Sequence, residues 1–134
     1  MKAYRWLAPV LAVATLSGCA TVAGMQQDFS SLVRLLEGGK GQKDLDAGIK
    51  AYEESNYRQA TRLIQTALDK GLVTSEQVRA HKYLAFIHCV SGEIQRCRDE
   101  FGKALALDPS FELREDEAGH PIWGPVFRSV KSRR

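Results

Sequence analysis

The 134-residue sequence lacks a strong excess of charge of either sign, and it has few aromatic residues and few prolines. Lys and Arg total 19 against 16 for Asp and Glu, which leaves a formal net charge of +3. A chain dedicated to nucleic-acid binding carries a basic face or stripe, so this balance argues against one. The 11 glycines and 4 prolines are too few for a collagen-like or linker-like chain. At this length the composition predicts one small folded domain.

The apolar stretch near the start of the chain is too short to span a membrane. It covers Trp6–Leu16, whereas a membrane-spanning helix needs about 20 residues. Lys2 and Arg5 precede it without any acid, and small residues follow it. This order is typical of a secretory signal peptide. The stretch closes with Leu-Ser-Gly immediately before Cys19, which matches the bacterial lipobox.

The lipobox implies that residues 1–18 are removed and that Cys19 carries a lipid anchor. In proteins with this box, the cysteine thiol receives a diacylglycerol, the chain is cleaved before the cysteine, and the new amino group is acylated. Two or more acyl chains suffice for stable anchoring. Ala20 stands where an aspartate would retain such a protein in the inner membrane, so the resemblance implies an outer-membrane lipoprotein that faces the periplasm. The alternative is an ordinary signal peptide followed by an incidental cysteine.

The rest of the chain shows helical spacing and no sustained alternation of the kind that predicts a β-strand. Apolar residues over 25–36 recur at helical spacing and predict a short amphipathic helix. A glycine-rich stretch at 38–41 ends this helix. We therefore expect residues 19–40 to hold the lipidated N-terminus, this helix and a linker, and residues 41–134 to form the folded domain.

Within the folded domain, small residues recur at a fixed period of 37 positions. The pairs are Gly48 and Ala85, Ala60 and Cys97, and Ala67 and Ala104. Such a period is typical of stacked helix pairs, because small side chains let two antiparallel helices approach closely. The alternative is a four-helix arrangement in which this spacing is accidental.

The second copy of this pattern resembles the tetratricopeptide repeat. The matching positions hold His81, Leu84, Ala85, His88, Cys97, Phe101, Ala104 and Pro109. His81 and His88 replace the usual aromatic residues, whereas Ala85 and Cys97 keep the small size. The first copy is weaker, because Ala51 stands where an aromatic residue is usual and no proline ends the unit.

Two repeats are fewer than the three or so that make a stable solenoid, so we expect flanking segments to cap the stack. The helix at 25–36 would cover one end. At the other end, the apolar segment 122–127 predicts a short helix through about Val130, followed by a solvated tail. The prediction is an all-α fold, a two-repeat tetratricopeptide-like stack of helix pairs with capping helices.

Two cysteines of the second repeat, Cys89 and Cys97, lie on either side of the turn at 91–92. In the oxidising periplasm a disulfide between them would persist, and it would stabilise a small domain. The alternative is that both are small buried residues that fill tight helix contacts. The residues alone leave both interpretations open.

Patterns for catalysis and metal binding are absent from the sequence. Neither Cys-x-x-Cys nor His-x-x-x-His spacing occurs among the available ligands, which are His81, His88, Cys89, Cys97 and His120. There is no phosphate-binding loop, serine-nucleophile motif or zincin motif. We therefore expect no enzyme activity, no metal, no cofactor and no small-molecule substrate.

The first helices of tetratricopeptide-like repeats line a concave face that grips other proteins. In this register, the predicted binding face holds Leu45, Ile49, Tyr52, Arg79, Lys82 and Phe86. Arg79 and Lys82 beside Phe86 would suit an extended partner segment with an acidic or carboxylate end. The alternative is that the N-terminal helix covers the apolar members and leaves only the charges exposed. The acids at 112–117 are expected to form solvated surface.

Three features together resemble the TssQ-type lipoproteins associated with type VI secretion. They are the lipobox, the repeat segment LAFIHCVSG at 84–92 and the ending EAGHPIWGPVF at 117–127. The resemblance implies an accessory, non-enzymatic component of the secretion envelope complex, with a protein partner and no nucleic acid. Two alternatives remain, namely a pilotin-like or envelope-assembly lipoprotein and a periplasmic regulator of a cell-wall enzyme.

Overall fold

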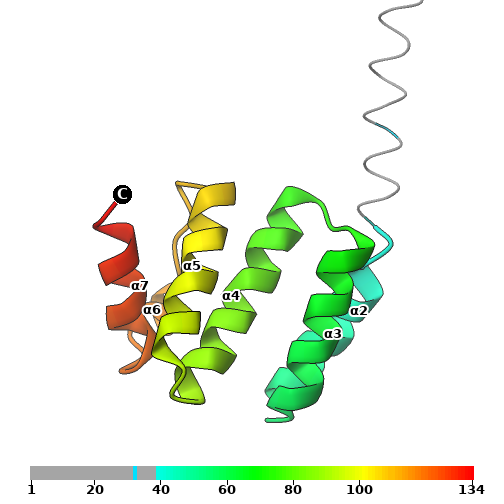
Figure 1. Ribbon diagram of the computed structural model, residues 1–134, viewed down its shortest axis with the longest axis horizontal. Helices are drawn as coiled ribbons and strands as arrows, with labels where there is room; N and C mark the ends of the chain where they lie inside the picture. The colour runs from blue at the N-terminus through cyan, green and yellow to red at the C-terminus, as the bar shows by residue number, and fades with distance from the viewer. Residues whose placement is uncertain (1–31, 33–38) are drawn as a thin grey trace, which may run out of the picture.

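The computed structural model describes Leu32 and residues 39–134, and this part of the chain folds as a stack of helices (Figure 1). The all-α prediction is confirmed, since no strand occurs among these residues. The helices are α2 (Gln42–Glu53), α3 (Tyr57–Lys70), α4 (Thr74–Val90), α5 (Ile94–Leu107), α6 (Glu115–Ala118) and α7 (Trp123–Lys131). None of these described helices is both long and apolar enough to cross a bilayer.

The features predicted for the N-terminal region lie outside the described residues. They are the signal peptide at 1–18, the lipid attachment at Cys19 and, apart from Leu32, the helix at 25–36. All three stay predictions. The helical domain itself begins with α2, directly after Gly41.

The helices form two antiparallel pairs, α2 with α3 and α4 with α5, as the period of small residues predicts (Figure 1). Short turns at 54–56, 71–73 and 91–93 join consecutive helices. After α6, α7 packs against α5 and α4 and ends at Lys131, next to the predicted end at Val130. The C-terminal segment therefore caps the second pair, as predicted.

Small residues bring the two helices of each pair close together. Gly48 faces Ile64, and a Cβ atom at Gly48 would lie 2.6 Å from Ile64 Cγ1. The other small residues of the repeat are fully buried, with 0% exposure: Ala60, Ala67, Ala85, Cys97 and Ala104. Larger side chains at these positions would push the paired helices apart. The repeat therefore marks the helix contacts themselves.

The buried side chains form two hydrophobic clusters, one between α2, α3 and α4 and the other between α4, α5 and the C-terminal segment with α7. The first cluster is aliphatic, and its larger members are Leu45, Ile49, Ile64, Leu72, Leu84 and Ile87. The second cluster is largely aromatic, and its larger members are Phe86, Phe101, Leu105, Leu113, Trp123, Val126 and Phe127. Tyr52 and Tyr83 are partly buried and pack against both clusters. These two tyrosines therefore lie at the junction of the two pairs.

Candidate functional site

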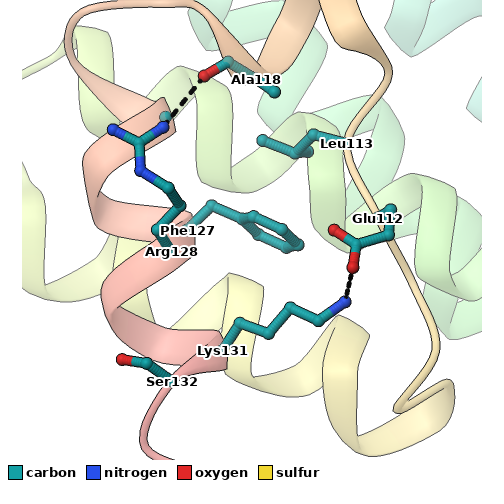
Figure 2. A pocket seen from close by; sticks show the side chains of 8 residues that line it. Glu112, Leu113, Ala118, Phe127, Arg128, Lys131 and Ser132 are labelled. Carbon is teal, nitrogen blue, oxygen red and sulfur yellow. Dashed lines mark hydrogen bonds and ion pairs between the residues drawn. The ribbon is translucent and has the colours of Figure 1, made fainter.

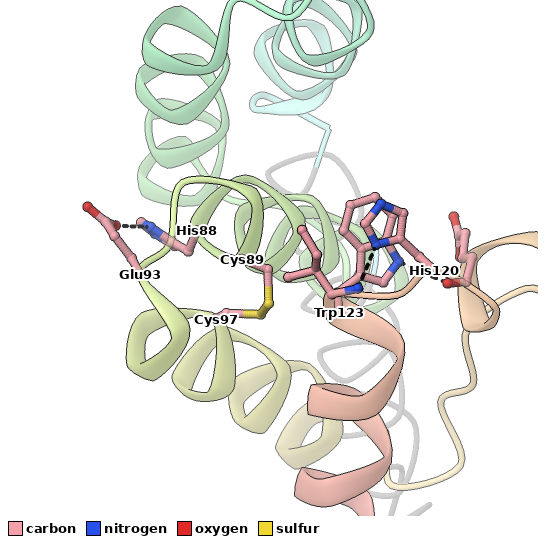
Figure 3. The surroundings of a disulfide bond; sticks show 8 residues. His88, Cys89, Glu93, Cys97, His120 and Trp123 are labelled. Atoms are coloured by element: carbon pink, nitrogen blue, oxygen red, sulfur yellow. Dashed lines mark hydrogen bonds and ion pairs between the residues drawn. A yellow bond between two sulfur atoms is a disulfide. The ribbon is translucent and has the colours of Figure 1, made fainter.

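The two cysteines of the folded domain lie on either side of the turn between α4 and α5, Cys89 in α4 and Cys97 in α5 (Figure 3). Cys89 and Cys97 are bonded to each other, and their Cα atoms lie 5.1 Å apart. Of the two interpretations left open by the sequence, the structure therefore favours the disulfide. At the same turn, Nδ1 of His88 donates to Glu93 Oε2 at 2.6 Å. This end of the second pair is joined both covalently and by a hydrogen bond.

The other two histidines lie apart from the disulfide. Nδ1 of His81 donates to Glu100 Oε2 at 2.6 Å, and Lys103 Nζ donates to Glu100 Oε1 at 2.6 Å. His120 stacks on Trp123, with ring centroids 3.3 Å apart (Figure 3). Within the described part of the chain, no three His, Cys, Asp or Glu side chains gather as a metal site requires. The histidines serve contacts within the domain.

The structure places the apolar members of the predicted binding face in the core. Leu45, Ile49 and Phe86 are only 0%, 5% and 2% exposed. The expectation that they line an open groove is therefore wrong. Leu45 and Ile49 belong to the cluster between α2, α3 and α4, and Phe86 is covered by Trp123 of α7 at a ring distance of 4.3 Å. Within the described residues, the C-terminal helix provides the cover for Phe86.

Lys82 of the predicted binding face is held inside the domain by an ion pair. Its Nζ donates to Glu117 Oε1 at 2.7 Å, and the two side chains are only 12% and 8% exposed. The same ammonium group lies 5.0 Å from the ring centroid of Tyr83. The acid that Lys82 was expected to meet on a partner is therefore supplied by this chain, and the prediction for Lys82 is corrected.

Arg79 is the cation of the predicted face that remains at the surface. Its side chain is 42% exposed, and its Nη1 lies 3.3 Å from Glu76 Oε2 and 3.9 Å from Asp46 Oδ1. Both acids are on exposed or partly exposed positions, so solvent screens these pairs strongly. The guanidinium keeps donor capacity for a partner, because it has five N–H groups.

A row of aromatic rings crosses this side of the domain and joins the two helix pairs. Tyr52 of α2 lies 5.2 Å from Tyr83 of α4, and Tyr83 lies 5.9 Å from Phe86, measured between ring centroids. Phe86 in turn stacks on Trp123. The indole N–H of Trp123 donates to the backbone carbonyl of Glu117 at 2.9 Å. Contacts with each other and with Phe86 hold the two tyrosine rings in place.

We define the tyrosine face as Tyr52, Tyr83 and Arg79. Burial, with smaller contributions from the neighbouring Tyr57, Tyr83 and Glu117, raises the pKa of Tyr52 to about 12. Burial also raises the pKa of Tyr83, although Arg79 opposes this shift. Both phenols therefore stay neutral at ordinary pH. No buried polar side-chain atom of the described residues lacks a hydrogen-bond partner, and both tyrosine side chains are only partly buried.

The sequence analysis did not identify Tyr83 or Glu117. Glu117 belongs to the acids expected to be solvated, yet it is only 7% exposed. Its Oε2 accepts from the backbone N–H of Arg114 at 3.1 Å. A glutamate at this position is recognisable in a sequence when Ser, Thr, Asp or Asn stands three residues before it. Arg114 stands there instead, so no sequence signal distinguishes Glu117 from its neighbours. Tyr83 has no sequence signal either.

No family model matches this chain, and neither a curated protein nor a solved structure matches it. A fold by itself does not assign a function, so the functional argument depends on the chemistry of the site. The tyrosine face offers two neutral phenol donors and one guanidinium in fixed positions. This chemistry suits the binding of hydrogen-bond acceptors.

Proposed function

We propose that this chain is a non-enzymatic outer-membrane lipoprotein, anchored at Cys19, whose helix stack holds a protein partner in the periplasm. We further propose that the partner is a component of a type VI secretion system. The lipobox supports the anchor, and the stacked helix pairs support a tetratricopeptide-like binding domain. The segments 84–92 and 117–127, which carry the resemblance to TssQ-type lipoproteins, contact each other through Phe86 and Trp123.

The observation that carries the binding proposal is the tyrosine face. Tyrosine and arginine are enriched among the residues that dominate the energy of protein–protein interfaces. The rings of Tyr52 and Tyr83 contact each other, and Tyr83 also contacts the buried Phe86. Because the rings are already ordered, these side chains lose little conformational entropy when a partner binds.

The partner segment is expected to present hydrogen-bond acceptors. The phenols of Tyr52 and Tyr83 stay protonated, so each can donate to a backbone carbonyl or a carboxylate. Arg79 adds a charged donor that suits an acidic residue or a chain end. Lys82 takes no part in this contact, because Glu117 already occupies its ammonium group.

The anchor is tested with Cys19→Ala in the full-length chain. This variant should remain uncleaved by the lipoprotein signal peptidase, because the thiol that receives the diacylglycerol is missing. It should also lose metabolic labelling with palmitate. Labelling equal to that of the wild type would refute the anchor.

The partner contact is tested with a photo-crosslinking residue in place of Glu53, an exposed residue next to Tyr52 whose charge acts on Tyr83, in lipidated protein in its native membrane. We expect a specific crosslink to a secretion-machinery protein, and Arg79→Glu should reduce its yield severalfold. Arg62→Glu, at an exposed position of α3, is the matched charge reversal and should leave the yield unchanged. Neither variant should alter the fold much, because exposed charges contribute little to stability.

Two results of this experiment would contradict the proposal. If Arg79→Glu leaves the crosslink unchanged, the tyrosine face is not the binding surface. If the crosslinked protein belongs instead to an outer-membrane assembly pathway or is a cell-wall enzyme, the assignment to type VI secretion is wrong.

A further inference from the structure

A second surface, formed by α5 and the end of the chain after α7, gathers arginine side chains. Arg98, Arg133 and Arg134 line one shallow hollow of about 530 Å³, together with Gln95 and Val130. No acidic residue lines this hollow. We refer to it as the arginine pocket.

The arginine pocket is held in place but its charge is not neutralised. Arg98 donates to the hydroxyl oxygen of Ser129 at 3.1 Å, and Arg134 donates to the backbone carbonyl of Gly102 at 2.8 Å. Among the described residues, pairs with a carboxylate within 4.0 Å form at other arginines, namely Arg79, Arg96 and Arg114. The guanidinium groups of the pocket therefore keep free donors for an anion.

Other residues of α7 line a second hollow, which is more apolar and also carries cations (Figure 2). Leu113 and Phe127 lie in a pocket of about 390 Å³, which Arg128 and Lys131 also line. Lys131 pairs with Glu112, whereas Arg128 donates to a backbone carbonyl (Figure 2). Cations therefore line both hollows.

We propose that the arginine pocket binds the phosphate groups of anionic phospholipids and docks this side of the domain on the membrane surface. Guanidinium groups bind phosphate oxygens in a bidentate manner. Residues 123–134 contain four cations and no acid, and such basic segments are attracted to anionic membrane surfaces. A lipid surface supplies many phosphates, whereas the end of a peptide supplies one carboxylate. Many phosphates suit the cations that line the two hollows better.

This inference rests on the proposed lipid anchor for access to the membrane. The 19 residues at 20–38 span at most roughly 60 Å when fully extended. A tether of that reach lets the α5–α7 side touch the bilayer. In Figure 1 the chain enters α2 and ends after α7 at the top of the view, at opposite ends of the stack.

Quenching by lipid headgroups tests the docking in lipidated full-length protein reconstituted in vesicles. A fluorophore on Ser132→Cys reports the end of α7, and one on Ser55→Cys, in the turn after α2, is the comparison site. Cys89 and Cys97 are bonded and the proposed anchor occupies the thiol of Cys19 with diacylglycerol, so only the introduced thiol reacts. In phosphatidylcholine vesicles with phosphatidylglycerol and a headgroup nitroxide, we expect strong quenching at 132 and weak quenching at 55.

The arginines are tested with the double variant Arg133→Gln, Arg134→Gln in the same vesicles. The docked-to-undocked ratio should fall about fivefold for each arginine removed. The double variant Arg58→Gln, Arg62→Gln removes equal charge from α3 and should leave the ratio unchanged. Equal quenching in pure phosphatidylcholine vesicles, or no effect of the pocket variant, would overturn the proposal. A response to soluble polyglutamate but not to anionic vesicles would overturn it in favour of an acidic protein segment.

Flotation of the vesicles at high salt measures the anchor separately. Salt screens the attraction between exposed charges and lipid, whereas inserted acyl chains remain in the bilayer. If the protein does not float, the proposed anchor is wrong, and the same quenching is then measured with protein added to preformed vesicles. Failure of the anchor and failure of the arginine pocket are thus distinguishable.

Discussion

The two helix pairs share a pattern of small residues but are stabilised in different ways. The first pair, α2 and α3, packs aliphatic and alanine side chains around Leu45 and Ile64. A partly exposed ion pair between Lys70 and Asp44, at 2.7 Å, also joins its helices. The second pair, α4 and α5, has the Cys89–Cys97 disulfide and an aromatic core that α7 covers.

This difference indicates an unequal distribution of stability along the stack. Exposed ion pairs contribute at most about 1 kcal/mol, whereas a disulfide and buried aromatic residues contribute several times more. We therefore expect the second pair to resist local unfolding more than the first. Tyr52 belongs to the first pair and Tyr83 to the second, so a partner bound at the tyrosine face would stabilise their junction.

The largest expected effect comes from removing the cover that α7 provides. Trp123→Ala should lower the free energy of unfolding by about 3–5 kcal/mol, because it leaves a cavity against Phe86. Trp123→Phe keeps an aromatic ring there but loses part of the buried ring volume and the hydrogen bond to the Glu117 carbonyl, so it should cost less, about 1–2 kcal/mol. Urea unfolding measures both values.

Native-state hydrogen exchange shows where the loss from Trp123→Ala falls. Protection should decrease mainly in α4 and α5, which contact α7, and much less in α2 and α3. Equal losses in both pairs would mean that the stack unfolds as one cooperative unit, and the contrast drawn between the pairs would then be wrong.

The next effect in size comes from breaking the disulfide. The double variant Cys89→Ala, Cys97→Ala should lower the free energy of unfolding by about 2–3 kcal/mol, because the unfolded chain loses a constraint on a short loop. The wild type in a reducing agent should show a similar loss. The reducing agent should not change the free energy of unfolding of the double variant. A change would show that the agent acts elsewhere than at this disulfide.

The sequence predicted the helix pairs well because their signals are local. The spacing of small residues depends on contacts within one pair, and Gly48 and Ala85 indeed lie where the helices approach. The capping helix was also predictable, because its apolar segment can be buried only by packing against the helix stack. The side chains that form these contacts are close in sequence or repeat at a fixed distance.

The exposed surface was predicted less well because it depends on contacts between distant segments. The repeat register puts Phe86 on the binding face, but Trp123 from α7 covers it. The partner of Lys82 is Glu117, and composition does not show which acid of the run 112–117 meets a lysine from another helix. Such pairings follow from the path of the chain after α5, which the repeat pattern does not encode.

The smallest expected effect concerns Glu100, which joins α5 to α4 of the second pair. Burial raises its pKa, but the hydrogen bonds from His81 and Lys103 outweigh burial, and the net pKa lies below the ordinary value of 4.5. A carboxyl with a lowered pKa in the folded state stabilises the fold fully above its unfolded pKa. That contribution is lost as the pH falls through the folded-state value.

Glu100→Gln removes this titration while keeping a side chain of similar shape. The stability difference between wild type and variant should be constant near neutral pH and should shrink as the pH falls below about 4.5. Asp44→Asn, which breaks the partly exposed ion pair of the first helix pair, is the comparison and should change stability little. Urea unfolding at a series of pH values measures both differences. If the difference in stability between wild type and Glu100→Gln persists unchanged into acid, the charge of the carboxylate does not stabilise the contact between α4 and α5. The shape and hydrogen bonds of the side chain then account for its role.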